Sequence, residues 1–284
     1  MPNQKFNKSD LHIIHAISNL HVGSGDNNFG IIDNQVQRDI ITKRPTINSS
    51  SLKGALRESF QKHEDESQFI KYVFGSHPVN DRGNDSQKGA YTFLASHLLV
   101  MPLRANTKAF FRATSPEIIK EFLSMVEIFE IELKELEALK KLINEHEPKE
   151  GSPIVFEELK ETIIEDLDRA EYKEFDTSTL SSLLGENIAL LHDADFNRYA
   201  NSLPVIARNH LEDGVSQNLW YEEVVPRESR FYFVTTKPSN LNSEDSDRIK
   251  RFEGMLHSDK MVQIGANATI GYGYCSIKKV SSDE

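Results

Sequence analysis

Apolar residues form short β-branched or alternating runs near both ends of the chain, which is the pattern of strands. Residues 11 to 20 are apolar and end at a glycine-rich turn at 23 to 25. They predict a buried strand followed by an irregular loop. Aromatic and β-branched residues predict further strands at 91 to 101, 229 to 235 and 272 to 280.

Apolar residues at helical spacing lie between these strands. One such stretch follows the serines at 49 to 51, which supply an N-cap, and another covers 242 to 257. A helix between strands near each end of the chain is typical of a split βαβ unit. The pattern therefore predicts an α+β fold with a ferredoxin-like (RRM-like) core and insertions.

The largest predicted insertion covers residues 115 to 176. Ser115 and Pro116 suit an N-cap and a first helical residue, and apolar residues keep helical periodicity as far as Leu136. After a helix-breaking stretch at 146 to 153, a second helix is predicted from 156 to 170. We expect an inserted helical hairpin.

A second insertion is predicted around an Asp-Gly turn. Asp213 and Gly214 lie between two stretches with apolar residues, and Asp-Gly is a strong signal for a β-hairpin over about 203 to 222. We expect one domain over 1 to 284 that carries this hairpin and the helical one.

Composition places the chain among ordinary globular proteins. Of its 284 residues, 38% are apolar and 27% charged, so it can bury a core. Cys275 is the single cysteine, which excludes an internal disulfide, and no Cys/His cluster has zinc-site spacing. The polar start and the lack of a bilayer-length apolar stretch argue against secretion and membrane insertion. We therefore expect a cytoplasmic location.

The net charge of −11 is concentrated in one segment. Residues 117 to 176 hold 8 Lys/Arg against 19 Asp/Glu, whereas residues 1 to 116 hold 14 against 10. RNA affinity depends on where basic groups lie, so the total charge does not exclude a nucleic-acid binder. The acidic carboxylates are spread over several turns without a converging histidine, which indicates a solvated helix face rather than an active site.

Three stretches carry candidate chemistry. They are LHVGSG at 20 to 25 with GIIDNQVQRD at 30 to 39 and RPTI at 44 to 47, SSSLKGALR at 49 to 57, and QIGANATIGYG at 263 to 273. Glycine-rich loops let backbone N–H groups approach phosphates, and Lys53 and Arg57 place two cations one turn apart. Each feature alone is common, so their joint order carries the argument.

That order resembles the repeat-associated mysterious proteins (RAMPs) of CRISPR systems, and most closely the backbone subunit of the Cmr (type III-B) effector complex. The shared features are the His-x-Gly-Ser-Gly turn, an Asp ahead of a Gln-Arg pair, the SSLKGALR helix start, Tyr-Glu-Glu before a proline, and the last glycine-rich loop. The chain departs from the family at Ala266, where a second glycine is usual. The acidic hairpin matches no family motif.

The resemblance implies a guide-RNA-binding backbone subunit that cleaves the paired target RNA at regular intervals. Copies would stack along the guide beside other Cmr-type subunits, and the hairpin around Asp213 would be a thumb inserted between guide and target. Base pairing would select the target, as in other RNA-guided effectors.

The expected site residues follow from the same resemblance. Asp33 is the candidate catalytic residue and ligand of a divalent cation (Mg or Mn), because a loop carboxylate beside a basic cradle can hold a metal or accept a proton. His21 is expected to assist, and Glu222 and Glu223 are weaker candidates. The expected RNA-binding residues are Arg38, Ser50, Lys53, Arg57, Gly265, Asn267, Thr269, Gly271, Tyr272 and Gly273.

Two alternatives stay open on the sequence. One is a non-catalytic scaffold that binds guide RNA in the same kind of complex. The other is a stand-alone endoribonuclease that processes CRISPR repeat RNA. Cleavage by the complex with Asp33 changed tests the first, and cutting of free repeat RNA tests the second.

Overall fold

The fold is described from a computed structural model, which covers residues 7–25, 31–61, 67–76, 87–239, 243–257 and 261–280. The strands are β1 Asn7–Ala16, β2 Thr46–Ile47, β3 Thr92–Phe93, β4 Ser96–Arg104, β5 Phe110–Thr114, β6 Ile154–Val155, β7 Glu171–Tyr172, β8 Ile188–Leu190, β9 Val205–Glu212, β10 Val215–Glu223, β11 Arg230–Pro238, β12 Val262–Gln263 and β13 Tyr274–Val280. The helices are α1 Ser49–Gln61, α2 Ser67–Phe74, α3 Pro116–Ile128, α4 Leu136–Glu145, α5 Ser181–Leu184, α6 Asp193–Asn201 and α7 Ser243–Leu256, with 3-10 turns at Ser178–Leu180 and Ala268–Ile270.

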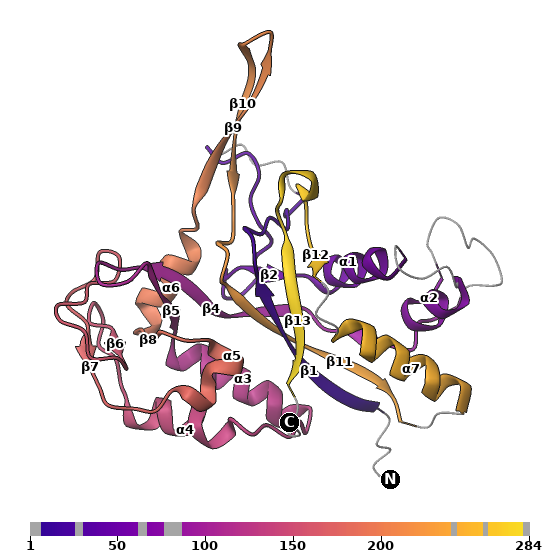
Figure 1. The fold of residues 1–284 in the computed structure, drawn as a ribbon, viewed down its shortest axis with the longest axis horizontal. Coiled ribbons are helices and arrows are strands. Elements are labelled where there is room, and N and C mark those ends of the chain that lie inside the picture. Colours follow the sequence, from indigo (N-terminus) through magenta and orange to yellow (C-terminus); the bar gives the residue numbers. More distant parts are fainter. Residues whose placement is uncertain are drawn as a thin grey trace.

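A long mixed sheet runs through the molecule, and its main path is β12-β13-β1-β11-β4-β5-β8-β6-β7. Figure 1 shows α1, α2 and α7 at one end of the sheet and α3 to α6 at the other. The central order β13-β1-β11-β4 is antiparallel, with α1 between β1 and β4 and α7 between β11 and β13. The mixed α/β class is confirmed, and this order supports the ferredoxin-like core, which stays a prediction.

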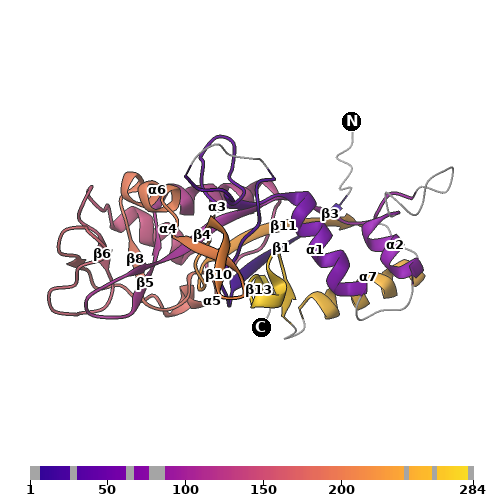
Figure 2. The same ribbon diagram turned by 90° about the horizontal axis from the view of Figure 1, so that it is seen from above.

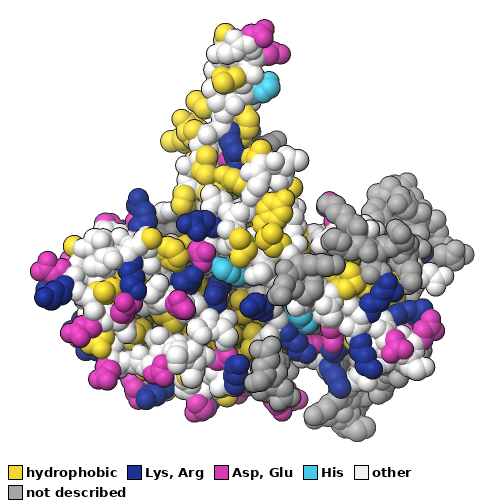
Figure 3. Space-filling view, viewed as in Figure 1, with side chains coloured by type: hydrophobic (Ala, Val, Ile, Leu, Met, Phe, Trp, Pro, Cys, Tyr) yellow, Lys and Arg dark blue, Asp and Glu magenta, His cyan; other side chains and the backbone are white. Residues whose placement is uncertain are grey.

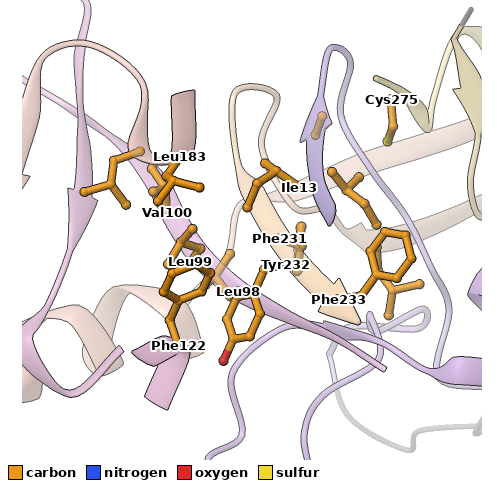
Figure 4. Close-up of a cluster of buried hydrophobic side chains, with 14 of the residues drawn as sticks. Ile13, Leu98, Leu99, Val100, Phe122, Leu183, Phe231, Tyr232, Phe233 and Cys275 are labelled. Carbon is orange, nitrogen blue, oxygen red and sulfur yellow. The ribbon is translucent and has the colours of Figure 1, made fainter. Parts of the chain in front are cut away.

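The core lies on both faces of the central strands. On one face Tyr232 of β11 meets Phe122 of α3 edge to face, with ring centroids 5.0 Å apart. On the other face Phe252 of α7 packs against Tyr91, Phe60 and Phe74 at 4.6 to 5.7 Å. Figure 4 shows Leu98, Phe122 and Tyr232 in the first of these clusters. Because side chains alternate along β11, one strand supplies both layers.

The helical insertion differs in part from the prediction. Ser115 caps α3 as expected, because its side chain accepts a hydrogen bond from the Ile118 N–H. The second helix, however, is α4 at Leu136–Glu145, and the helix predicted at 156 to 170 is wrong. Glu161 and Glu165 have φ of 55° and 51°, which breaks a helix, although Ile164 is fully buried. The helix-like spacing of apolar residues between 156 and 170 therefore reflects the burial of loop residues, not a helix face.

The predicted β-hairpin is present and projects from the body. β9 and β10 form a separate two-stranded sheet, which Figure 1 shows standing clear of the rest and Figure 2 shows end-on. Asp213 and Gly214 at its tip have φ of 51° and 80°, as a tight hairpin turn requires. No helix in the described ranges is long and apolar enough to cross a membrane.

Candidate functional site

The base of the β9–β10 hairpin fixes the loop that carries Asp33. The Tyr221 N–H donates to Asp33 Oδ2 at 2.7 Å, and the N–H groups of Asp33 and Asn34 both donate to the Tyr221 carbonyl at 3.1 Å. The Glu223 N–H in turn donates to the Asn34 carbonyl at 2.9 Å. Asp33 itself is exposed. One carboxylate oxygen is thus oriented by backbone while the side chain still faces solvent.

Glu223 connects the same loop to Arg38. Its carboxylate accepts the Val36 N–H at 3.0 Å and pairs with the Arg38 guanidinium, although Glu223 is only 4% exposed. Arg38 also donates to the carbonyls of Lys43 and Ala200 at 2.8 and 3.0 Å. A buried carboxylate without its cation would be costly, so Arg38 acts here within the fold. Its predicted contact with RNA stays untested.

The Glu222 side chain, at the base of the hairpin, lies close to residues from three parts of the chain. Its carboxylate accepts from Arg208 Nε at 3.0 Å and from Asn267 Nδ2 at 2.9 Å, and His21 Nε2 lies 3.9 Å away. Arg208 belongs to β9, and its guanidinium also stacks 4.6 Å from the centroid of the Tyr272 ring. Glu222 therefore joins the hairpin, the last glycine-rich loop and the strand exit at His21.

His21 is a buried connector. It is 4% exposed, and its Nδ1 lies 2.7 Å from the Glu223 carbonyl, which can only accept. Nδ1 must therefore carry the proton, which leaves Nε2 facing Glu222. The predicted assisting role of His21 is compatible with this contact only through Glu222, because the imidazole is not at the surface.

The loop at 263 to 273 packs on the backbone of His21. The Ala266 N–H donates to the His21 carbonyl at 2.8 Å, and a Cβ on Gly265, whose φ is +88°, would lie 2.3 Å from that same oxygen. Glycine is needed there because of this close approach. Ala266 has no positive φ, so the departure from the family's second glycine leaves the backbone unstrained. Thr269 and Gly271 are exposed on the outer side of the loop, while Gly273 and half-buried Tyr272 support it.

Helix α1 presents its predicted cations differently. Arg57 donates to the carbonyls of Phe74 and Gly75 at 2.7 and 2.9 Å, so it ties α1 to the end of α2. Lys53 is half-buried, and burial together with the nearby Arg57 lowers the pKa of its ammonium group. Ser50 is exposed at the helix start. Lys53 and Arg57 were both predicted to contact RNA. The structure gives them different surroundings, because Arg57 makes contacts within the fold.

Gln37 and Arg208 are the residues that sequence analysis missed. Gln37 donates to Ser51 Oγ at 2.9 Å and accepts the Asn48 N–H, so it joins the Asp33 loop to the start of α1. Only its place beside Arg38 in the motif hinted at this contact. Arg208 gave no signal beyond its position on the predicted hairpin.

The described His, Asp and Glu side chains of this region do not converge on one point. In the ranges that the structure covers, no three His, Cys, Asp or Glu side chains are placed to hold a metal ion together. Asp33 offers one carboxylate. Mg²⁺ is often held by one or two carboxylates together with substrate phosphates and water, so a single Asp fits a metal shared with RNA.

Comparisons with known proteins give a consistent result. The RAMP superfamily pattern matches residues 13–276. The "CRISPR system Cmr endoribonuclease Cmr4" of Pyrococcus furiosus is 27% identical over 288 residues, covering 95% of each chain. A cryo-EM structure of the type III-B Cmr-beta complex bound to cognate target RNA contains a chain with a TM-score of 0.77 and 24% identity, covering 97% of this chain and 98% of that one. The crystal structure of oligomeric Cmr4 from Pyrococcus furiosus gives 0.70 and 21%, with 97% and 98% covered.

Proposed function

Because the chain belongs to the RAMP superfamily, we propose that it is a guide-RNA-binding backbone subunit of a type III-B CRISPR effector and that it cleaves the target RNA paired with the guide. The relative that aligns along 95% of the chain is named an endoribonuclease of the Cmr system. Similar folds occur in a Cmr complex bound to target RNA and in an oligomeric Cmr4. Its partners would then be guide RNA, target RNA, further Cmr-type subunits and copies of itself.

The observation that carries the catalytic assignment is the geometry of Asp33. Its carboxylate is held at one oxygen by the Tyr221 N–H, at the base of the projecting hairpin, and the residue is exposed. A carboxylate in this position can take a proton from an attacking hydroxyl, and positioning of this kind contributes on the order of a hundred- to ten-thousand-fold. Asp33 is the group that would touch the reacting RNA.

A divalent cation fits this assignment as a finer proposal. Asp33 would be the protein ligand, and Mg or Mn bound there would neutralise charge developing on the phosphate. Glu222 and Glu223 are unsuited to this task, since each already accepts from an arginine and is 4% exposed. They, and His21 through Glu222, would position the Asp33 loop and the hairpin.

The hairpin would act as the thumb of the family. Leu211, Val215 and Leu219 are 57%, 60% and 53% exposed along it, and Figure 3 shows hydrophobic side chains along the whole projection. Apolar side chains that have no core to enter can insert between bases and replace their stacking. Such insertion beside Asp33 would open the RNA backbone at the phosphate whose cleavage Asp33 would assist.

Guide binding is proposed for the outer side of the glycine-rich loop and the start of α1. Thr269, Gly271 and Ser50 are exposed there, and Lys53 supplies a cation. Contacts from loops and a helix start favour phosphates over bases, so binding would be insensitive to sequence. Arg38 and Arg57 would contribute indirectly, by holding these segments.

The decisive experiment compares Asp33→Asn with Asp213→Asn in the assembled complex. Asn keeps an oxygen that can accept the Tyr221 N–H, so assembly and target binding should be normal while cleavage falls at least a hundredfold. The tip variant tests whether a charge change on the hairpin matters, and Asp247→Asn, at an exposed Asp of α7 that has no part in the proposed site, is the control that should cleave normally. Cleavage is measured on gels with Mg, with Mn and with chelator.

Each alternative function predicts its own outcome, in this experiment or in an assay of the isolated chain. Normal cleavage by the Asp33→Asn complex would leave the chain a scaffold, and lost binding together with lost cleavage would make Asp33 structural. Cutting of free repeat RNA by the isolated chain would indicate a processing enzyme instead. Full activity in chelator would remove the metal but keep Asp33. A cytoplasmic location stays a prediction.

A further inference from the structure

The β9–β10 hairpin and the loop that carries Asp33 are held together by backbone groups of β10. The Tyr221 N–H donates to Asp33 Oδ2 at 2.7 Å, and the Tyr221 carbonyl accepts from the N–H groups of Asp33 and Asn34 at 3.1 Å. Because the strand itself makes these contacts, the Asp33 carboxylate follows any movement of the hairpin base. The place of Asp33 in the molecule therefore depends on how the hairpin is fixed.

The glycine-rich loop at 263 to 273 is anchored to a different part of the chain. Its Gly273 N–H donates to the carbonyl of Asn19, which follows β1, at 2.8 Å. Thr269 and Gly271 are exposed on this loop, where guide contact is proposed. Figure 1 shows the loop, between β12 and β13, beside the foot of the hairpin. The proposed guide contacts and the proposed catalytic carboxylate thus lie on separate segments.

Arg208 of β9 connects these two segments. Its Nε donates to Glu222 Oε2 at 3.0 Å, and its guanidinium carbon lies 4.6 Å from the centroid of the Tyr272 ring, which belongs to the glycine-rich loop. Glu222 also accepts from Asn267 Nδ2 of that loop at 2.9 Å. The side chains of Arg208 and Glu222 are only 21% and 6% exposed. Both the charge-assisted bond and the cation–π contact are stronger when they are shielded from water in this way.

The contacts of Arg208 suit a guanidinium group and point away from direct work on RNA. A guanidinium is planar, so it can donate to a carboxylate at its edge while its face stacks on an aromatic ring. Its Nη2 is buried and makes no hydrogen bond within the described structure, so this nitrogen is not offered to RNA. Arg208 can therefore influence the reaction only through Glu222 and Tyr272.

We propose that Arg208 is a positioning residue for target cleavage, which fixes Asp33 relative to the guide RNA held on the glycine-rich loop. The inference rests on the proposed function. A cut at a set distance along the guide requires a constant spacing between the guide contacts and the carboxylate. A misplacement of about 1 Å can cost on the order of a hundredfold in rate. Loss of the Arg208 contacts would leave guide and target bound, with the target phosphate misplaced at Asp33.

Assembled complexes that carry Arg208→Met test this, with Arg248→Met as the matched control. Methionine keeps an unbranched side chain and removes the charge. Arg248 of α7 also pairs with a carboxylate, that of Asp245 at 3.1 Å, and also lies over a tyrosine ring, that of Tyr72 at 5.3 Å. Figure 1 shows α7 far from the projecting hairpin. The measurements are guide and target affinity, the cleavage rate at saturating target, and the position of the cut on a sequencing gel.

The Arg208→Met complex should bind guide and target within about twofold of the parent but cleave about ten- to a hundredfold more slowly at saturating target. Its products should include ends shifted by one or more nucleotides, which a loss of stability alone would not produce. Arg208→Lys should recover part of the rate, because it keeps the pair with Glu222 but not the stack on Tyr272. Tyr272→Leu added to Arg208→Met should cause little further loss, since the two side chains act through one contact. Arg248→Met should cleave like the parent.

Cleavage by the Arg208→Met complex at the parent's rate and positions overturns the proposal. So does a loss of guide or target binding that accounts for the loss of cleavage, which would place Arg208 in the binding surface. If Arg208→Met does not assemble, Arg208→Lys decides: slower cutting with shifted ends supports the proposal, and parental cutting overturns it. Failure of the proposed function gives a different result, because the parent complex would then not cut, or the Asp33→Asn complex would cut normally.

Discussion

Replacing Gly265 by alanine should destabilise the protein far more than the same change at the hairpin tip. Both Gly265 and Gly214 have positive φ, of +88° and +80°, so alanine pays a left-handed penalty of roughly 1–2 kcal/mol at either position. Only at Gly265 does the new Cβ meet backbone, 2.3 Å from the His21 carbonyl oxygen and 2.9 Å from its carbon. At Gly214 nothing lies within 4 Å.

The extra cost at Gly265 follows from the movement that relieves this contact. Cβ atoms essentially never come within 3.0 Å of such a neighbour, so the loop must move away from His21. That movement lengthens the 2.8 Å hydrogen bond from Ala266 to the same carbonyl, and a buried acceptor left without its donor costs about 1–3 kcal/mol. Gly265→Ala should therefore lose about 2–5 kcal/mol, against about 1–2 kcal/mol for Gly214→Ala.

Urea unfolding of the two variants and the parent chain measures this difference as a change in the free energy of unfolding. Gly265→Ala should also weaken guide-RNA binding, because the displaced loop carries Thr269 and Gly271. If the two variants differ by less than about 0.5 kcal/mol, the loop yields without cost and the close packing on His21 is not what holds it.

Other perturbations have equally definite outcomes. Burial, followed by the neighbouring His257, lowers the pKa of His12 to about 3. As the pH drops, His12 therefore takes up a proton in the unfolded chain before it does so in the folded one. The free energy of unfolding should fall between about pH 6.5 and pH 3, by up to about 1.4 kcal/mol per pH unit. His12→Gln should flatten that slope in urea unfolding at pH 5 to 6.5, and an unchanged slope would exclude His12. Lys53→Ala should remove about one phosphate contact with the guide. The slope of log affinity against log salt concentration should then become shallower by about 0.7, the value for single strands. An unchanged slope with unchanged affinity would remove Lys53 from the site. Photocrosslinking of guide RNA should yield no adduct within the acidic segment 117 to 176, which repels a phosphate backbone over a Debye length of about 8 to 10 Å, and a strong adduct there would contradict the assignment.

Local patterns predicted most elements because they act over one or two turns of chain. The cap at Ser115, the helix from Ser49 and the turn at Asp213 each depend on adjacent residues, and all three were confirmed. The helix predicted at 156 to 170 was wrong because Ile164 is buried by tertiary packing in a loop, which gives the same spacing as a helix face.

The site was predictable in its parts but not in its connections. The resemblance named Asp33, Glu222 and the last loop as separate candidates, and the structure shows Asp33 in contact with Tyr221 and Glu222 in contact with Asn267. Whether a cation faces solvent or a carbonyl depends on chain segments distant in sequence. Arg57 reaches the end of α2, and Arg38 reaches a carbonyl of α6, and neither partner is visible from the motif that contains the arginine.

The β9–β10 hairpin also has a consequence for how such proteins diverge. The outer part of the hairpin lies outside the core, with Leu211 and Val215 more than half exposed, so the sequence and length of this part can vary without loss of the fold. Eight residues of β9 at about 3.4 Å each give it a reach of roughly 27 Å, and two more residues in each strand would add about 7 Å. The distance that the hairpin reaches from the body can therefore change during evolution while the rest of the molecule stays the same.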